Sequence, residues 1–142
     1  MTFVDTGFFF ALFSLRDRHH QRAKEAFRRF EGQNLANVLV TTDQVVLETI
    51  TLARMRVSHK LAVFMGERLY SGKIARIHST TLDEHRAAFD YFRRYSDKSY
   101  SAFDCLSFVV MDRLGIREAV AIDEDFTHRF VAIPGPLPRA GR

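Results

Sequence analysis

Short apolar segments alternate along this chain with longer segments whose apolar residues recur at the spacing of a helix. The short segments predict strands at residues 2–5, 38–41, 74–78 and 119–122, with an edge strand at residues 129–133. The longer segments predict helices at residues 8–15, 17–31, 43–57, 61–70, 81–95 and 103–114. Because helices separate successive strands, we expect an α/β fold, a parallel β-sheet flanked by α-helices on both faces.

Polar residues mark several of the predicted helix starts. Asp17 is suited to cap the helix over residues 17–31, and Thr81 with Glu84 forms a capping-box pattern. Ser101 and Asp104 repeat that pattern before the last helix, which is apolar almost all round. We therefore expect the last helix to lie at the centre of the fold.

The size and composition of the chain fit one domain. Its 142 residues are 46% hydrophobic and 27% charged, and we place the domain at residues 1–133 with a loose tail at 134–142. The longest apolar run, residues 8–13, is far shorter than the roughly 20 residues that cross a bilayer, so we expect no membrane association. A single cysteine, Cys105, allows no internal disulfide, which predicts a cytoplasmic protein.

Four acidic residues stand in apolar segments, where burying an uncompensated carboxylate costs several kcal/mol. They are Asp5, Glu48, Asp104 and Asp123. Asp5 and Asp123 follow predicted parallel strands, at the edge of the sheet where α/β proteins place their sites. Glu48 lies on the inward row of its helix, and Asp104 lies in the first turn of the central helix. We expect all four carboxylates to meet above one edge of the sheet.

Some of these acids also have a purely structural interpretation. Asp104 can serve only as the capping-box partner of Ser101, and Asp123 can serve only to start a helix. Asp5 and Glu48 have no basic neighbour at helical spacing that accounts for them. Asp125 is either a further ligand or a surface acid, and we favour the surface role.

Four carboxylates in one cluster repel one another unless a cation neutralises them. Oxygen ligands without a Cys or His set indicate Mg²⁺ or Mn²⁺, which keep several waters. Such a site can hydrolyse phosphodiesters with a metal-activated water. The six histidines lack the spacing of zinc sites, and no glycine-rich phosphate loop is present in the sequence.

The charge balance weakly favours an anionic partner. The chain has 21 Lys and Arg against 17 Asp and Glu, a net charge of +4. Arg16, Arg18 and Arg22 are candidates to bind an RNA backbone, although a solvated helix face explains them at least as well. The alternative basic groove contains Arg54, Arg56 and Arg129.

The chain resembles the PIN-domain family and, within it, the VapC-type toxin ribonucleases of type II toxin-antitoxin systems. The resemblance lies in the segments FVDTGFFFAL, DRHHQRA, TTDQVVLETITLA and YSAFDCLSFVVMDRLGIREAVAIDEDF. It implies that Asp5, Glu48, Asp104 and Asp123 are catalytic acids that hold Mg²⁺ or Mn²⁺. It also implies a metal-dependent endoribonuclease with an RNA substrate, a cognate antitoxin that lies across the active-site groove, and a homodimer.

Two residues depart from the pattern of that family. Phe103 stands where a small hydroxyl residue is frequent before the third acid, and Glu124 stands where a basic residue is frequent beside the fourth. Both bear on how water, metal or substrate is positioned, and neither removes a carboxylate. Two other functions stay open: a PIN ribonuclease of RNA processing outside any toxin pair, and a catalytically idle RNA-binding module.

Overall fold

The structure is a computed structural model that describes residues 1–122 and 131–134. Its five strands form one sheet in the order β3-β2-β1-β4-β5, and every neighbouring pair is parallel. The strands are β1 Thr2–Val4, β2 Leu39–Thr42, β3 Arg76–His78, β4 Glu118–Ala121 and β5 Val131–Pro134. The predicted parallel sheet and the predicted edge strand are confirmed. Residues 135–142, most of the predicted tail, lie outside the described part of the chain.

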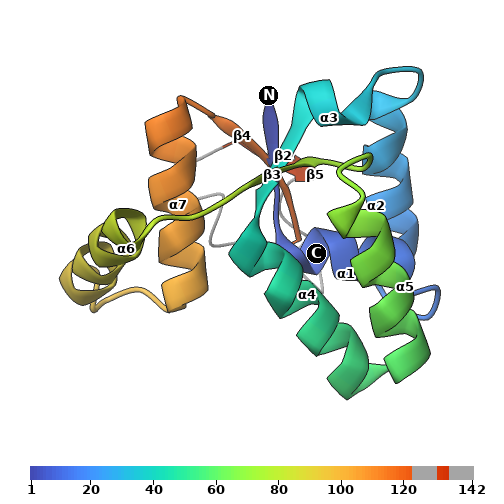
Figure 1. The fold of residues 1–142 in the computed structure, drawn as a ribbon, viewed down its shortest axis with the longest axis horizontal. Helices are drawn as coiled ribbons and strands as arrows, with labels where there is room; N and C mark the ends of the chain where they lie inside the picture. The colour runs from blue at the N-terminus through green and yellow to red at the C-terminus, as the bar shows by residue number, and fades with distance from the viewer. Residues whose placement is uncertain (123–130, 135–142) are drawn as a thin grey trace, which may run out of the picture.

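Helices cover both faces of this sheet, as the sequence predicts. They are α1 Thr6–Phe13, α2 His20–Phe27, α3 Leu35–Val38, α4 Asp43–Arg56, α5 His59–Tyr70, α6 Leu82–Arg94 and α7 Ala102–Leu114, with a 3₁₀ turn, η1, at Arg28–Phe30. Figure 1 shows α6 and α7 on one side of the sheet, and α1, α2 and α5 on the other. In the part of the chain that the structure describes, no helix is long and apolar enough to cross a membrane.

The second helix differs from its prediction. The sequence pattern has Asp17 capping a helix over residues 17–31, but α2 begins only at His20. The carboxylate of Asp17 instead accepts a hydrogen bond from the backbone N–H of His19 at 2.8 Å, which closes a turn ahead of the helix. The one-turn helix α3 at Leu35–Val38 was not predicted, because four residues are too few to display a helical period.

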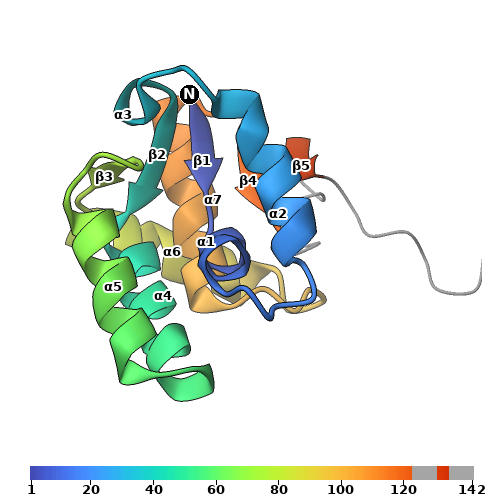
Figure 2. The same cartoon turned by 90° about the vertical axis from the view of Figure 1, so that its right-hand side faces the viewer.

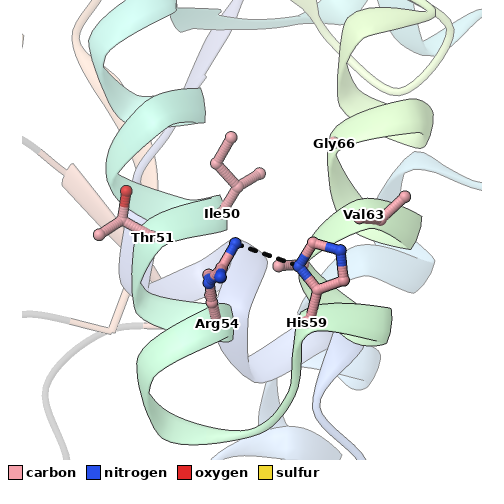
Figure 3. A pocket seen from close by; sticks show the side chains of 7 residues that line it. Ile50, Thr51, Arg54, His59, Val63 and Gly66 are labelled. Carbon is pink, nitrogen blue, oxygen red and sulfur yellow. Dashed lines mark hydrogen bonds between the residues drawn. The ribbon is translucent and has the colours of Figure 1, made fainter.

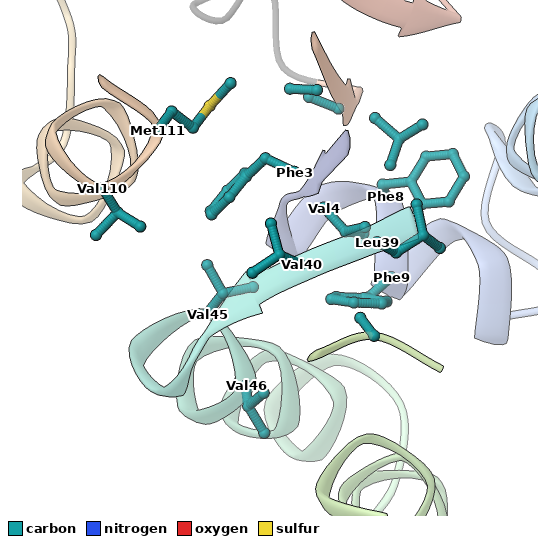
Figure 4. Packing of buried hydrophobic residues seen from close by; sticks show 14 of the residues in the cluster. Phe3, Val4, Phe8, Phe9, Leu39, Val40, Val45, Val46, Val110 and Met111 are labelled. Carbon is teal, nitrogen blue, oxygen red and sulfur yellow. The ribbon is translucent and has the colours of Figure 1, made fainter. Parts of the chain in front are cut away.

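The core follows the alternation of side chains along the central strands. Phe3 and Val4 of β1 are both buried but point to opposite faces of the sheet. Figure 4 shows Phe3 toward Val110 and Met111 of α7, whereas Val4 lies with Phe8 and Leu39 on the other side. Every residue of α7 from Cys105 to Met111 is buried, so the predicted central position of the last helix is confirmed.

Both predicted capping boxes are present, at the starts of α6 and α7. In each box a hydroxyl and a carboxylate satisfy backbone N–H groups that the first turn leaves without helical partners. The α7 helix ends at Gly115, whose φ of +69° is the left-handed conformation that glycine adopts without strain. These local signals fix where α7 begins and ends relative to the sheet.

The parallel arrangement brings the carboxyl ends of the strands to one edge. Helix α1 begins at Thr6, two residues after β1 ends, and α4 begins immediately after β2 ends. Figure 2 shows β1 and β2 running in the same direction, with α1 just beyond the end of β1. This edge therefore receives the first residues of two helices, which is where α/β folds place their sites.

Candidate active site

Three of the four acids singled out from the sequence line a single pocket of about 360 Å³ at this edge. We call it the acid pocket, and it is lined by Asp5, Thr6, Gly7, Glu48, Leu52, Ser99, Ser101 and Asp104. These residues come from segments that lie far apart in the sequence and meet only in the folded chain. The fourth acid, Asp123, lies outside the described residues, as do Glu124 and Asp125.

Asp5 occupies the junction between β1 and α1. Its backbone N–H donates to the carbonyl of Val120 at 3.1 Å, so the central pair of strands fixes its main chain. The residue is only 6% exposed, and its side chain does not cap the helix that follows. The carboxylate is therefore positioned by the sheet itself, at the end of a strand that cannot shift without disrupting the core.

Glu48 reaches the acid pocket from the middle of α4, where it is half-buried. Its Oε1 accepts a hydrogen bond from the hydroxyl of Thr6, the first residue of α1. A hydroxyl donor orients a carboxylate without neutralising it, whereas a paired Lys or Arg would cancel its charge. Thr6 was not among the residues picked from the sequence.

Asp104 forms the capping-box contact weighed for it from the sequence. Its Oδ2 accepts from the backbone N–H of Ser101 at 3.0 Å, and its own N–H donates to the Ser101 hydroxyl at 3.0 Å. This is the predicted capping box, so the structural interpretation is correct. The same carboxylate also lines the acid pocket, beside the N-terminus of α7, where a partial positive charge favours anions.

Phe103 does not line the acid pocket, although it was expected to affect the positioning of water or metal. Its side chain is 44% exposed and instead lines two neighbouring pockets between α4, α6 and α7. The hydroxyl-bearing residues in the acid pocket are Thr6, Ser99 and Ser101. A serine two positions before Phe103 thus supplies a hydroxyl next to the third acid.

The donor chemistry of the acid pocket fits a hard divalent cation. Carboxylate and hydroxyl oxygens without sulfur or imidazole are the ligands that Mg²⁺ and Mn²⁺ prefer. As placed, however, no group of three or more His, Cys, Asp and Glu side chains within residues 1–122 and 131–134 has the geometry that holds a metal ion. The three carboxylates border a common space but do not form a complete set of metal ligands. That these acids bind a metal therefore remains a prediction.

Arg54 and Arg56, which the sequence analysis grouped in one basic groove, line different pockets. Arg16 and Arg56 line one pocket of about 490 Å³, between the loop after α1 and the end of α4. Arg54 lines a different pocket, between α4 and α5, where its Nη1 lies 3.2 Å from Nδ1 of His59 (Figure 3). The Nε of Arg18 donates to His19, and Arg129 lies outside the described residues.

The fold and the site together define the class of this protein. It is a parallel α/β domain with carboxylates gathered at the carboxyl edge of its sheet. A profile of the PIN domain matches residues 2–129, which is most of the chain. The chain therefore belongs to the PIN domain family, and the resemblance found in the sequence is confirmed.

Individual relatives agree with this assignment. The chain is 33% identical over 127 residues to the 23S rRNA-specific endonuclease VapC20 of Mycobacterium tuberculosis, covering 89% of this chain and 92% of the relative. It is 28% identical over 142 residues to a VapC ribonuclease of Archaeoglobus fulgidus, covering 98% of this chain and 81% of the relative.

Solved structures extend the comparison to the fold. The crystal structure of VapC20 from Mycobacterium tuberculosis, described as a sarcin-ricin loop cleaving toxin, superposes with a TM-score of 0.82 at 31% identity. The match covers 90% of this chain and 94% of VapC20. A toxin-antitoxin complex from Klebsiella pneumoniae has a TM-score of 0.60 at 16% identity, with 97% of each chain covered, which shows the same fold.

Proposed function

We propose that this chain is a metal-dependent endoribonuclease, the toxin of a toxin-antitoxin pair, which hydrolyses RNA phosphodiester bonds. The observation that carries the proposal is the acid pocket, where Asp5, Glu48 and Asp104 converge from three separate segments. Its support from other proteins is the 33% identity to an enzyme that is named as an rRNA-specific endonuclease.

In this proposal Asp5, Glu48, Asp104 and Asp123 hold Mg²⁺ or Mn²⁺. A bound ion of this kind supplies positive charge to a phosphate and lowers the pKa of a nearby water. The chain supplies the positions: the sheet fixes Asp5, the Thr6 hydroxyl orients Glu48, and the capping box holds Asp104. The N-termini of α1 and α7 also meet the acid pocket, where their partial positive charge favours an anionic phosphate.

The test is cleavage of total RNA by the protein after removal of any partner that copurifies with it. We expect cleavage with Mg²⁺ or Mn²⁺ and none with excess chelator, because none of the described side chains that line the acid pocket is a convincing alternative nucleophile. Undiminished cleavage in chelator contradicts metal dependence. RNA binding without any cleavage favours the idle binding module instead.

The toxin role is tested separately from the chemistry. Expression of the chain alone should arrest growth of the host cell, and coexpression with its cognate antitoxin should restore growth. Cleavage in vitro without growth arrest favours a PIN ribonuclease of RNA processing. We also propose a cytoplasmic location, which agrees with the proposed RNA substrate and with the free, buried thiol of Cys105.

The proposed homodimer has a candidate surface beside the acid pocket. Four exposed apolar side chains, which we call the apolar strip, lie along α4, α6 and α7: Leu47, Met55, Phe89 and Phe103. Phe103 lines both pockets of this surface, which makes the strip continuous from α4 to α6. Such patches on soluble proteins mark interaction sites.

Light scattering coupled to size-exclusion chromatography tests this surface. We expect a dimer for the natural chain and a monomer for Phe103→Ser. Tyr70→Ser, which removes an exposed aromatic side chain elsewhere on the molecule, should remain dimeric. A monomeric natural chain contradicts the homodimer.

A further inference from the structure

A second pocket lies at the far end of α1 and α4, two of the three helices whose residues line the acid pocket. We call it the arginine pocket, and it is lined by Phe13, Ser14, Leu15, Arg16, Arg56, Val57 and Leu61. Helix α1 runs from Thr6 in the acid pocket to Phe13 in the arginine pocket. Helix α4, which packs against α1, contributes Glu48 to the first pocket and Arg56 to the second.

The spacing of the two pockets follows from helix geometry. Glu48 and Arg56 lie two turns apart on α4, which corresponds to about 12 Å along the axis at 1.5 Å per residue. Leu52, midway between them, also lines the acid pocket, so the two sites share one side of the helix. A strand of RNA lying along the surface of α1 and α4 covers this distance with a few nucleotides.

The chemistry of the arginine pocket is different from that of the acid pocket. Arg16 and Arg56 are both exposed, and neither forms an ion pair with any residue that the structure describes. Among the residues that the structure describes, none that lines this pocket carries a carboxylate. Two unpaired guanidinium groups from separate segments are suited to a phosphate, which accepts their planar donor pairs.

The apolar wall of the arginine pocket favours a ligand that also has an apolar face. Phe13 lines it, and the ring of Phe13 is held edge-on against Phe64, with centroids 6.1 Å apart. Together with Leu15 and Leu61, this wall matches the apolar face of a base better than it matches water or a free phosphate ion. A nucleotide combines both features in one ligand.

We propose that the arginine pocket binds a backbone phosphate and the adjoining base of the RNA strand, a few nucleotides from the phosphate that is cleaved in the acid pocket. This inference rests on the proposed ribonuclease function. It assigns Arg16 and Arg56 to substrate binding, and it leaves Arg54 out, since Arg54 faces the other pocket beside His59.

The chain offers a matched control for this assignment. Arg54 and Arg56 both lie in the last turn of α4, so replacing either removes one charge and the same favourable interaction with the helix dipole. They point to opposite sides of the helix and line different pockets. A difference between the two alanine variants therefore reports on the arginine pocket and not on total charge.

The first experiment measures binding of a single-stranded RNA oligonucleotide as a function of salt, with every variant carrying Asp5→Asn so that the RNA stays intact. Arg16→Ala and Arg56→Ala should each weaken binding and lower the slope of log K against log salt by about 0.7, the value for one lost contact with a single strand. Arg54→Ala should leave the slope unchanged. Equal effects of Arg54→Ala and Arg56→Ala, or no effect of either, overturn the proposal.

The second experiment locates the bound phosphate by shortening the substrate from each end in turn. In the catalytically intact chain, Arg56→Ala should raise KM for a long RNA and leave kcat at saturation unchanged, because the acid pocket is untouched. The rise in KM should disappear once one end of the RNA is trimmed to within a few nucleotides of the cleaved bond. An effect that persists on the shortest cleaved RNA contradicts the proposed position.

A third arm addresses a protein partner, because an acidic peptide is also attracted to two arginines. Polyglutamate serves as the probe. Loss of polyglutamate binding in Arg16→Ala and Arg56→Ala, with RNA binding intact, overturns the proposal in favour of a protein-docking site. Failure of the proposed function is distinguishable from this result, because it is the absence of any metal-dependent cleavage by the unmodified chain.

Discussion

The hydroxyl of Thr6 donates a hydrogen bond to Oε1 of Glu48, and so joins the first residue of α1 to the middle of α4. The two residues are 42 positions apart in the sequence, and both line the acid pocket. Thr6 is 6% exposed, which protects the hydrogen bond from competing water. The contact therefore ties the position of one candidate ligand to the packing of two helices.

Replacing Thr6 tests whether this contact orients Glu48. Thr6→Val keeps the shape of the side chain and removes the donor, so we expect kcat for RNA cleavage to fall by about tenfold or more, the worth of a hydrogen bond to a charged group. KM should change little. Thr6→Ser restores the donor and should recover most of the activity, which a purely structural role of the threonine methyl group does not predict.

Asp5→Asn separates chemistry from folding. We expect RNA cleavage to be abolished, because Asn keeps the shape of the side chain but loses its charge. Folding stability should stay the same or rise, because one of several mutually repelling carboxylates is gone. Activity and urea denaturation measure the two effects.

The matched control for Asp5 is Asp43→Asn. Asp43 begins α4 at the same edge of the sheet but does not line the acid pocket, and its carboxylate accepts from the N–H and hydroxyl of Thr80. We expect this variant to lose some stability and keep its activity. A destabilised Asp5→Asn protein with full activity contradicts the assignment of Asp5.

The sequence predicted the fold well where a pattern is long or strongly marked. The core strands, α4 and α7 follow from periodicity, and the two capping boxes follow from a hydroxyl and an acid three residues apart. The cap assigned to Asp17 was wrong, because a turn and a helix start use the same side-chain oxygen to accept a backbone N–H.

For the candidate site, the sequence identified the acids through their apolar surroundings, which is a local signal. Thr6 carried no such signal, because its role depends on Glu48 arriving from another helix. The grouping of Arg54 with Arg56 ignored helical geometry, in which residues two apart point to opposite sides. The sequence alone did not predict the long-range packing of helices or the directions of these side chains.

Metal binding can be measured without any RNA. If the acid pocket holds Mg²⁺ or Mn²⁺, the ion should stabilise the folded chain, by about 2.7 kcal/mol at 100 times its Kd, and so raise Tm by several degrees. Asp5→Asn and Asp104→Asn should lose most of this rise in thermal denaturation, and Asp43→Asn should retain it. An equal rise in all four proteins contradicts a site in the acid pocket.

Acid stability should depend on Glu84 at the start of α6. Burial by itself raises the pKa of this carboxyl, but the backbone N–H of Thr81 and the ring of His78 stabilise its charged form and bring the pKa below 4.5. Nε2 of His78 lies 3.0 and 3.1 Å from the two carboxylate oxygens. A lowered pKa in the folded state means that ionised Glu84 stabilises the fold above about pH 4.5, and that this contribution is lost as the pH falls through the folded-state pKa.

Glu84→Gln should therefore be less stable than the natural chain at pH 7, and the gap should narrow below pH 4.5. Asp83→Asn is the control, because Asp83 is exposed and forms a surface ion pair with Arg113. Its effect should stay within about 1 kcal/mol. Urea denaturation at a series of pH values measures both variants, and a gap for Glu84→Gln that is independent of pH contradicts the assignment.

The two capping boxes allow the structural and functional roles of a cap to be separated. Ser101→Ala and Thr81→Ala each remove a hydroxyl that accepts from the third residue of a helix, so each should cost about 1 kcal/mol of stability. Only the box at α7 includes an acid of the acid pocket, since the N–H of Asp104 donates to the Ser101 hydroxyl that the variant removes. We therefore expect RNA cleavage, measured well below Tm, to fall in Ser101→Ala and to stay near the natural level in Thr81→Ala.

Ser101→Thr, which keeps the hydroxyl, should restore both stability and cleavage. Equal activity of the two alanine variants indicates that the α7 box acts only as a helix cap.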